Sequence, residues 1–257
     1  MTFEKLMNDG LLGTKLIEKY TSGETVSIPF VYFLLCIFAC AAIGYLIGSL
    51  NFGVIISKFY GADIRTKGSG NAGATNMMRV YGKKASIMTF VGDILKTIIA
   101  VFIGRLLIMG VIGAYITGLF VISGHAWPLY FGFRGGKGVA AIAAFVLSTE
   151  PLIFLIELVI FIAILFSFKM VSLASVMIAL IYPYILAVLT GNGTHIMVAF
   201  IASVLVIFLH RQNIVRIFNH TEHKFKLGKK EKKQEPAIQE SEAPEQIEEA
   251  QNEEGKE

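Results

Sequence analysis

The chain is poor in charge. Only 16% of its 257 residues are Asp, Glu, Lys or Arg, whereas 54% are hydrophobic and the mean hydropathy is +0.64. A soluble domain usually carries about 25% charged residues. The apolar residues here form runs long enough for helices of about 20 residues, the length that crosses a bilayer. The composition therefore excludes an ordinary soluble domain and predicts an all-α polytopic membrane protein.

Cysteine is also scarce. Cys36 and Cys40 are the only two, and they lie four residues apart in the first apolar run. On a helix they would share one face, where packing against lipid or a neighbouring helix explains them better than a disulfide or a metal site.

Several catalytic motifs are absent from the sequence. There is no GxSxG elbow for a serine hydrolase, and no HExxH or paired Cys/His spacing for zinc. A GxGxxG string occurs at 68–73, but no strand precedes it, so a dinucleotide-binding fold is not supported. The lysine of the pair Gly136–Lys137 is followed by glycine rather than Ser or Thr, unlike a Walker A loop.

Carboxylates are nearly missing from the polar segments between the apolar runs. The first segment, Asp63–Lys84, contains Asp63 alone, and the second, Gly124–Gly138, contains none. A divalent cation would lack oxygen ligands there. We therefore expect neither a metal nor another cofactor.

Glycines, small polar side chains and cations are what these segments do contain. Such groups suit a phosphate, because backbone N–H groups, hydroxyls and positive charge can all bind its oxygens. A third polar segment, 209–225, is also rich in cations and histidines. The cations of the first two segments are Arg65, Lys67, Arg79, Lys83, Lys84, Arg134 and Lys137.

Six or seven membrane spans are expected. The count depends on the run 139–148, which is short for a full span and resembles a half-helix pointing at a ligand. With about seven spans the cationic segments all lie on one side, which the positive-inside rule assigns to the cytoplasm. The N-terminus is then outside and the C-terminus cytoplasmic. The expected runs are 29–56, 85–105, one ending near 124, 139–148, 152–168, 171–189 and 194–209.

One ionisable pair is expected inside the membrane. Asp93 and Lys96 are three residues apart and so share a helix face. Charged groups at membrane depth usually face the protein interior, paired or functional. A structural ion pair and a pair facing the site both agree with this spacing.

Three regions are predicted along the chain. Residues 1–28 form an N-terminal extension without the features of a signal peptide, residues 29–226 form the membrane domain, and residues 227–257 form a charged tail. The tail has too few apolar residues to offset the entropy of ordering and is expected to be disordered.

Together the polar strings resemble a known family. GSLNFG (48–53) with the first segment, GHAWPLYFGFRGGKGVA (124–140), and VSLAS (171–175) with the third segment are similar to the bacterial acyl-phosphate:glycerol-3-phosphate acyltransferases. The resemblance covers about residues 30–226. It implies a seven-helix enzyme of the bacterial inner membrane, with its site facing the cytoplasm. The implied reaction moves a fatty acyl group from acyl phosphate to the 1-hydroxyl of glycerol 3-phosphate, giving lysophosphatidic acid and phosphate in phospholipid synthesis.

The resemblance also implies roles for individual residues. Ser69, Arg79, Lys137 and His210 are expected as catalytic residues, and together with Ser175 and Asn213 they match the glycerol-phosphate pocket. The glycine-rich backbone is expected to hold acyl phosphate. The substrate-binding residues implied there are Gly68, Gly70, Asn71, Gly73, Thr75, Asn76, Gly135, Gly136 and Gly138. A serine that only bonds its own helix is the alternative for Ser175.

The expected mechanism needs no nucleophile on the enzyme, since acyl phosphate is already an activated anhydride. His125, His195 and His210 are not followed five residues later by Asp, the pattern of other glycerol-phosphate acyltransferases. The proton acceptor is either His210 or a phosphate oxygen of a substrate, whose second pKa is about 6. The phosphate is favoured, because no carboxylate is evident to orient the histidine.

The expected partners are the two substrates and the lipid bilayer, with no nucleic acid. A transient contact with the soluble enzyme that makes acyl phosphate is compatible with this role, although no residue demonstrates it. Two other functions agree with parts of the sequence: a transporter or channel for a phosphorylated solute, and a non-catalytic lipid-binding scaffold. The concentration of cations on one side argues against a transporter.

Overall fold

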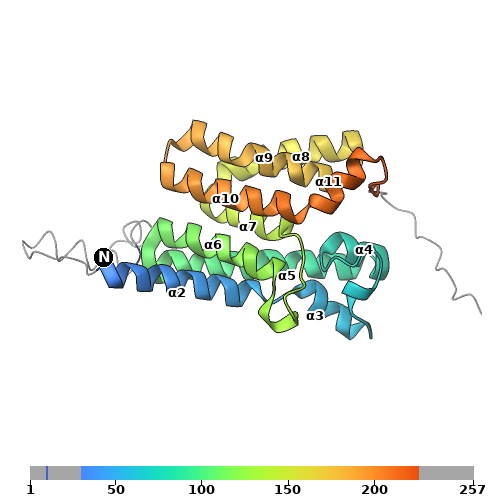
Figure 1. The fold of residues 1–257 in the computed structure, drawn as a ribbon, viewed down its shortest axis with the longest axis horizontal. Coiled ribbons are helices and arrows are strands. Elements are labelled where there is room, and N and C mark those ends of the chain that lie inside the picture. Colours follow the sequence, from blue (N-terminus) through green and yellow to red (C-terminus); the bar gives the residue numbers. More distant parts are fainter. Residues whose placement is uncertain (1–9, 11–29, 226–257) are drawn as a thin grey trace, which may run out of the picture. The chain divides into compact units, whose positions relative to one another are not determined.

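All elements of the described part of the chain are helical. A computed structural model describes Gly10 and residues 30–225 (Figure 1). The predicted N-terminal extension 1–28 and the tail 227–257 lie outside this part, except for Gly10. The α-helices are α2 (Phe30–Gly48), α3 (Phe52–Phe59), α4 (Ala74–Tyr81), α5 (Lys83–Ile103), α6 (Gly110–Ala126), α7 (Val139–Thr149), α8 (Pro151–Phe168), α9 (Val171–Thr190), α10 (Gly193–Leu209) and α11 (Arg211–Phe218). Short 3-10 turns, η1 (Ile64–Thr66) and η3 (Leu129–Phe131), and a π-helical turn, η2 (Gly104–Met109), connect them.

The prediction of an all-α polytopic membrane protein is confirmed. Five stretches are long and apolar enough to cross a bilayer, and a sixth arises if α10 and α11, which meet at a 59° bend, form one span. The apolar run predicted at 139–148 is the eleven-residue α7. At 1.5 Å per residue it is about 17 Å long, well short of a hydrocarbon core of about 30 Å. It therefore fits the predicted half-helix.

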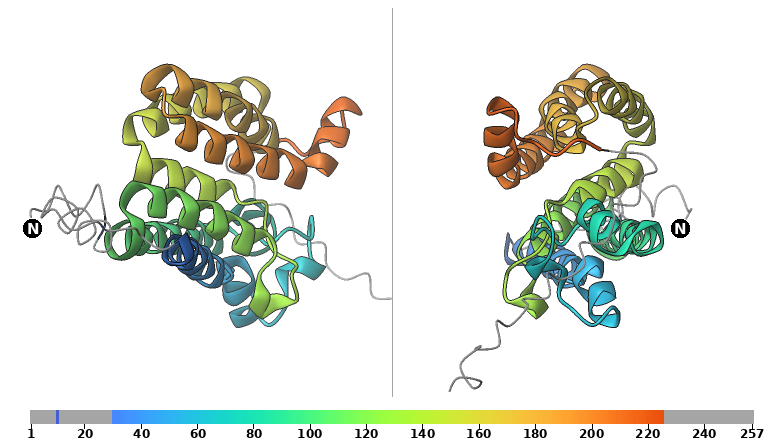
Figure 2. Two further views of the ribbon diagram at one scale, coloured as in Figure 1. Left: turned by 60° about the vertical axis from the view of Figure 1, so that its left-hand side comes forward. Right: turned by 90° about the vertical axis from the view of Figure 1, so that its right-hand side faces the viewer.

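Helix α7 lies between two groups of helices (Figure 1). Helices α2, α5 and α6 pack on one side, and α8, α9 and α10 on the other, an arrangement that the two turned views in Figure 2 also show. The buried ring of Phe145 on α7 meets Tyr115 of α6 and Tyr182 of α9 edge to face. Such aromatic pairs add about 0.5–1.5 kcal/mol beyond the burial of their area, so the core is centred on the short helix.

The apolar run predicted as one helix over 29–56 is broken in the structure. Helix α2 ends at Gly48 and α3 begins at Phe52, so the prediction of a continuous helix there was wrong. The buried Asn51 has an extended backbone, and its side chain accepts a hydrogen bond from the Val54 N–H at 3.1 Å. Asn51 thereby caps the start of α3. The local preference of an N-cap residue outweighs the hydropathy pattern at this point.

The beginning of the second polar segment also differs from the prediction. Helix α6 continues to Ala126, so Gly124 and His125 belong to a buried helix end rather than to a loop. A side chain at Gly124 would collide with the backbone of α2, which runs alongside. The glycine therefore permits close helix packing.

Candidate phosphate and acyl binding site

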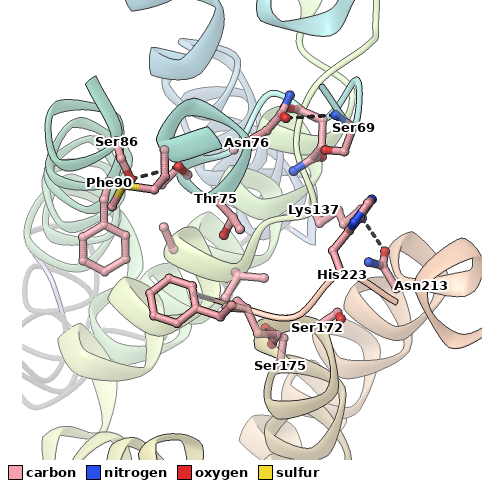
Figure 3. Close-up of a pocket in the computed structure, with 18 of the residues that line it drawn as sticks. Ser69, Thr75, Asn76, Ser86, Phe90, Lys137, Ser172, Ser175, Asn213 and His223 are labelled. Carbon is pink, nitrogen blue, oxygen red and sulfur yellow. Dashed lines mark hydrogen bonds between the residues drawn. The ribbon is translucent and has the colours of Figure 1, made fainter. Parts of the chain in front are cut away.

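Residues from all three predicted polar segments line one cavity of about 480 Å³, a size typical of ligand sites. Figure 3 shows side chains around it from several elements. Ser86 and Phe90 come from α5, Ser172 and Ser175 from α9, and Lys137 from the loop before α7. The site is thus assembled from distant parts of the chain.

The first polar segment is held together by Asn76, which is 1% exposed. Its Oδ1 accepts from the Ser69 N–H at 2.9 Å (Figure 3). Its Nδ2 donates to the carbonyl oxygens of Lys67 and Asn71, both at 3.0 Å. Both polar atoms of the Asn76 amide are thus engaged in hydrogen bonds within the segment. Asn76 therefore shapes the loop that presents Ser69 and Asn71 to the cavity.

Helix α4 carries two further predicted residues to the cavity wall. Thr75 lies in its first turn and Arg79 in its last. They are four residues apart, so they share one helix face. The start of α4 also directs backbone N–H groups toward this region, which favours an anion.

Lys137 reaches the cavity from the glycine loop that precedes α7. Gly138 adopts a left-handed conformation with φ 75°, which suits glycine because it has no Cβ. The Lys137 ammonium donates a hydrogen bond to Oδ1 of Asn213 on α11 (Figure 3). Burial, with a contribution from the positive charge of Arg216, lowers the pKa of Lys137 to about 8. The ammonium is thus charged at neutral pH but poorly solvated, which favours binding of an anion.

Glu222 joins the side chains of α9 and α11 that form the wall of the cavity across from α4, called the α9–α11 wall below. Its Oε1 accepts from Ser172 Oγ and from Asn213 Nδ2, both at 2.7 Å, and its Oε2 accepts from Arg216 Nε at 2.8 Å. Burial alone would raise the pKa of Glu222, but these hydrogen bonds outweigh it and hold the pKa below its ordinary value. The carboxylate is therefore ionised and turns Asn213 so that its carbonyl oxygen faces Lys137.

His210 lies at the junction of α10 and α11 and is 2% exposed. Its Nδ1 is 2.8 Å from the carbonyl oxygen of Val206. A carbonyl only accepts hydrogen bonds, so Nδ1 carries a proton, and in the neutral imidazole Nε2 then keeps its lone pair. A backbone carbonyl therefore orients this histidine. The sequence had shown no carboxylate that could do so.

Eleven of the fifteen predicted site residues line the cavity. Ser175 does so, and its hydroxyl donates to the Val171 carbonyl at 2.9 Å, which is the helix-backbone bond expected of the alternative interpretation; its role toward a substrate stays a prediction. Four glycines do not line it and instead shape the loops behind it. These are Gly68, Gly70, Gly135 and Gly136. The eleven that do are Ser69, Asn71, Gly73, Thr75, Asn76, Arg79, Lys137, Gly138, Ser175, His210 and Asn213.

Two parts of the cavity were not predicted. One is the group of ionisable residues Arg216, Glu222 and His223, which lie in the third polar segment but form no local sequence pattern. The other is an apolar wall with contributions from α5, α7 and α8. It consists of Ile87, Phe90, Val139, Ala140, Phe161 and Leu165, with Val171 and Phe225 nearby. Lipid-facing and cavity-facing apolar residues look alike in sequence, so only tertiary contacts distinguish them.

The shortage of carboxylates was inferred for the first two polar segments, and two carboxylates from other parts of the chain also contribute to the cavity. Asp93 and Glu222 both reach the cavity wall. Within residues 30–225, however, no group of three or more His, Cys, Asp or Glu side chains gathers as metal ligands. The charge of Glu222 is taken up by Arg216 and by two neutral donors, as described above.

The fold and the cavity define a multi-pass membrane protein with a cationic, amide-rich pocket beside an apolar wall. The family model described as Glycerol-3-phosphate acyltransferase matches residues 38–220. A glycerol-3-phosphate acyltransferase of Geotalea daltonii is 42% identical over 182 residues, covering 71% of this chain and 94% of the relative. One from Thermoanaerobacter sp. is 43% identical over 191 residues, covering 74% and 95%.

Solved structures agree. The glycerol 3-phosphate form of PlsY (YgiH), an integral membrane glycerol 3-phosphate acyltransferase, superposes with a TM-score of 0.70 at 34% identity, covering 74% of this chain and 96% of that one. Its lysophosphatidic acid form gives 0.68, also at 34% identity. The chain belongs to the glycerol-3-phosphate acyltransferase family, as the polar strings indicated.

Proposed function

We propose that this protein transfers a fatty acyl group from acyl phosphate to the 1-hydroxyl of glycerol 3-phosphate, with its site facing the cytoplasm of a bacterial inner membrane. The observation that carries the proposal is the composition of the cavity. Cations and amides from three distant segments meet beside an apolar wall. One end suits phosphate groups and the other suits an acyl chain, which is what a reaction between these two substrates needs.

The proposed reaction needs two phosphates side by side, and the two sides of the cavity offer groups for both. Lys137, Asn213 and Ser175 lie toward the α9–α11 side and suit glycerol 3-phosphate. Asn71, Thr75 and the start of α4 lie on the other side and suit the phosphate of the acyl donor. Lysine neutralises the charge of a phosphate as a point charge, whereas helix N–H groups and hydroxyls donate directional hydrogen bonds to the phosphate oxygens.

The proposed step is a direct acyl transfer. The hydroxyl oxygen of glycerol 3-phosphate bonds to the acyl carbon, the bond from that carbon to the phosphate oxygen breaks, and the hydroxyl proton passes to a phosphate oxygen. The products are lysophosphatidic acid and inorganic phosphate. Positioning and stabilisation of the departing phosphate by the cavity supply the catalysis.

The reaction is tested with purified protein in detergent, acyl phosphate and glycerol 3-phosphate, without added metal or coenzyme A. We expect lysophosphatidic acid and phosphate to form in equal amounts. A parallel reaction with acyl coenzyme A as donor should give little product, because the cavity has cationic and amide groups for a phosphate beside the acyl chain. No product from acyl phosphate would contradict the proposed reaction, and equal rates with both donors would contradict the assigned donor.

The proton acceptor is tested with His210→Ala. A backbone carbonyl orients His210 but does not stabilise an imidazolium as a carboxylate would, so we expect the phosphate to accept the proton. The variant should then lose about tenfold in rate through lost positioning, while the rise of kcat with pH on the acidic side stays in place. Disappearance of that acidic limb in the variant would identify His210 as the base.

A further inference from the structure

A buried cluster of three ionisable residues lies behind the glycine loop that carries Lys137. The cluster consists of Asp93 and Lys96 on α5 and His125 at the end of α6, with side chains 2–3% exposed. Lys96 Nζ is 2.8 Å from Asp93 Oδ1 and 3.0 Å from His125 Nδ1, and His125 Nδ1 is 3.4 Å from Asp93 Oδ1. The predicted pair of Asp93 and Lys96 therefore forms and acquires a third member.

The cluster binds the end of α2. Lys96 Nζ donates to the carbonyl oxygens of Gly48 at 2.9 Å and Leu50 at 2.7 Å. The last carbonyls of a helix have no hydrogen-bond partner within the helix, so an ammonium there satisfies them. Its positive charge also interacts favourably with the negative end of the helix dipole. Lys96 thereby holds the break between α2 and α3 in a defined place.

The cluster also supports the glycine loop. The Gly136 N–H donates to the His125 carbonyl and the Gly135 N–H to the Ala126 carbonyl, both at 3.1 Å. The imidazole of His125 lies against Gly136 so closely that a Cβ on Gly136 would overlap the ring. Lys137 follows directly in the chain, so the position of its backbone depends on where the His125 ring lies.

Stability alone is a weak reason for such a cluster. Buried charges lose solvation, and well-packed apolar residues in their place are often neutral or stabilising. Ionisable groups at membrane depth are therefore expected to serve a function. Asp93 and His125 also reach the cavity wall, whereas Lys96 lies behind it.

We propose that Asp93, Lys96 and His125 are positioning residues, which join the end of α2 to the loop at 132–138 and so set where the Lys137 ammonium lies in the cavity. This inference rests on the proposed function for its kinetic test only. A chain of contacts runs from the carbonyls of Gly48 and Leu50 through Lys96 and His125 to Gly136. With its backbone held in this way, Lys137 donates its hydrogen bond to Asn213.

The first test measures Lys137 directly and does not depend on activity. Acetic anhydride in trace amounts modifies lysines in their uncharged form, and mass spectrometry reports the rate at each site. In Lys96→Met and in His125→Gln we expect the modification rate of Lys137 to change by at least threefold, while that of exposed Lys84 stays constant. Glu157→Gln, which alters another buried acid that lies outside this cavity, is the matched control and should leave the Lys137 rate unchanged.

Kinetics give the second test. Lys96→Met should raise the KM for glycerol 3-phosphate about tenfold with a smaller effect on the KM for acyl phosphate. In a Lys137→Arg background the change in this KM caused by Lys96→Met should differ markedly from tenfold, because the effects of two residues are not additive when one acts through the other. If Lys96→Met does not fold, as judged by gel filtration in detergent, the charge-neutral pair of changes Asp93→Asn with Lys96→Met takes its place.

Three results would overturn the inference: an unchanged Lys137 modification rate in a folded variant, a fully additive loss with Lys137→Arg, or an equal effect of Glu157→Gln. The first of these stands even if the wild-type protein shows no acyl transfer. An inactive wild type would instead remove the proposed function.

Discussion

Replacing Lys137 by methionine is expected to lower kcat/KM for glycerol 3-phosphate by about a hundredfold or more. Methionine keeps much of the length of the side chain but removes the ammonium that meets Asn213 and neutralises the phosphate. Losing one partner of a buried, hydrogen-bonded charge pair costs about 2–5 kcal/mol, and about 1.4 kcal/mol corresponds to a tenfold change. Steady-state rates of lysophosphatidic acid formation measure the effect.

Lys84→Met is the matched control. It makes the same change in charge and shape, but Lys84 is exposed in the first turn of α5 and does not line the cavity. We expect its kcat/KM to stay within twofold of the wild-type value. Similar losses in the two variants would mean that overall charge, rather than the Lys137 site, governs the rate.

The pH dependence of KM gives a second measure of the same residue. Burial lowers the pKa of Lys137 to about 8, so its ammonium is charged below that pH and neutral above it. Affinity for the phosphate dianion should therefore fall, and KM for glycerol 3-phosphate should rise, as pH increases from 7.5 to 9. In Lys137→Arg the guanidinium stays charged over this range. A KM that rises equally in the wild type and in this variant would assign the titration to another group.

Replacing Glu222 by alanine should both destabilise the protein and remove most of its activity. The change leaves Ser172, Asn213 and Arg216 without the acceptor that they share. Arg216 is about one-third exposed, so water compensates part of its loss. Each buried polar group left unpaired costs about 1–3 kcal/mol, and we expect a total near 3 kcal/mol. Thermal unfolding in detergent should show a midpoint lower by about 6–12 °C.

Glu150→Ala provides the comparison for this change. The Glu150 carboxylate accepts a hydrogen bond from the Tyr115 hydroxyl at 2.8 Å and does not line the cavity. Removing it should cost about 1 kcal/mol and leave the KM for glycerol 3-phosphate unchanged. If Glu222→Ala is no less stable than Glu150→Ala and retains its activity, Glu222 does not organise the α9–α11 wall.

Much of this protein follows from the sequence. The scarcity of charge and the length of the apolar runs determine a helical membrane protein, because a bilayer admits backbone only when its polar groups are bonded internally. The glycines, amides and cations of the polar segments predict an anion site, since backbone N–H groups, amides and cations are the groups that bind phosphate oxygens. Taken together, the strings around Ser69, Lys137 and His210 are specific enough to indicate the family.

Tertiary structure alone decided how these segments work together. The sequence does not show that Asn76 uses its amide to shape its own loop, because many polar side chains of that loop could make the same hydrogen bonds. It also does not show that Glu222 turns Asn213 toward Lys137, because Lys137 is distant from both in the chain. Asn51 broke a helix that hydropathy alone would continue. His125 looked like part of a loop, yet its burial beside Asp93 and Lys96 places it beneath Gly136. Hydropathy and motif patterns report local preference, whereas the position of each charge in the cavity depends on which helices pack together.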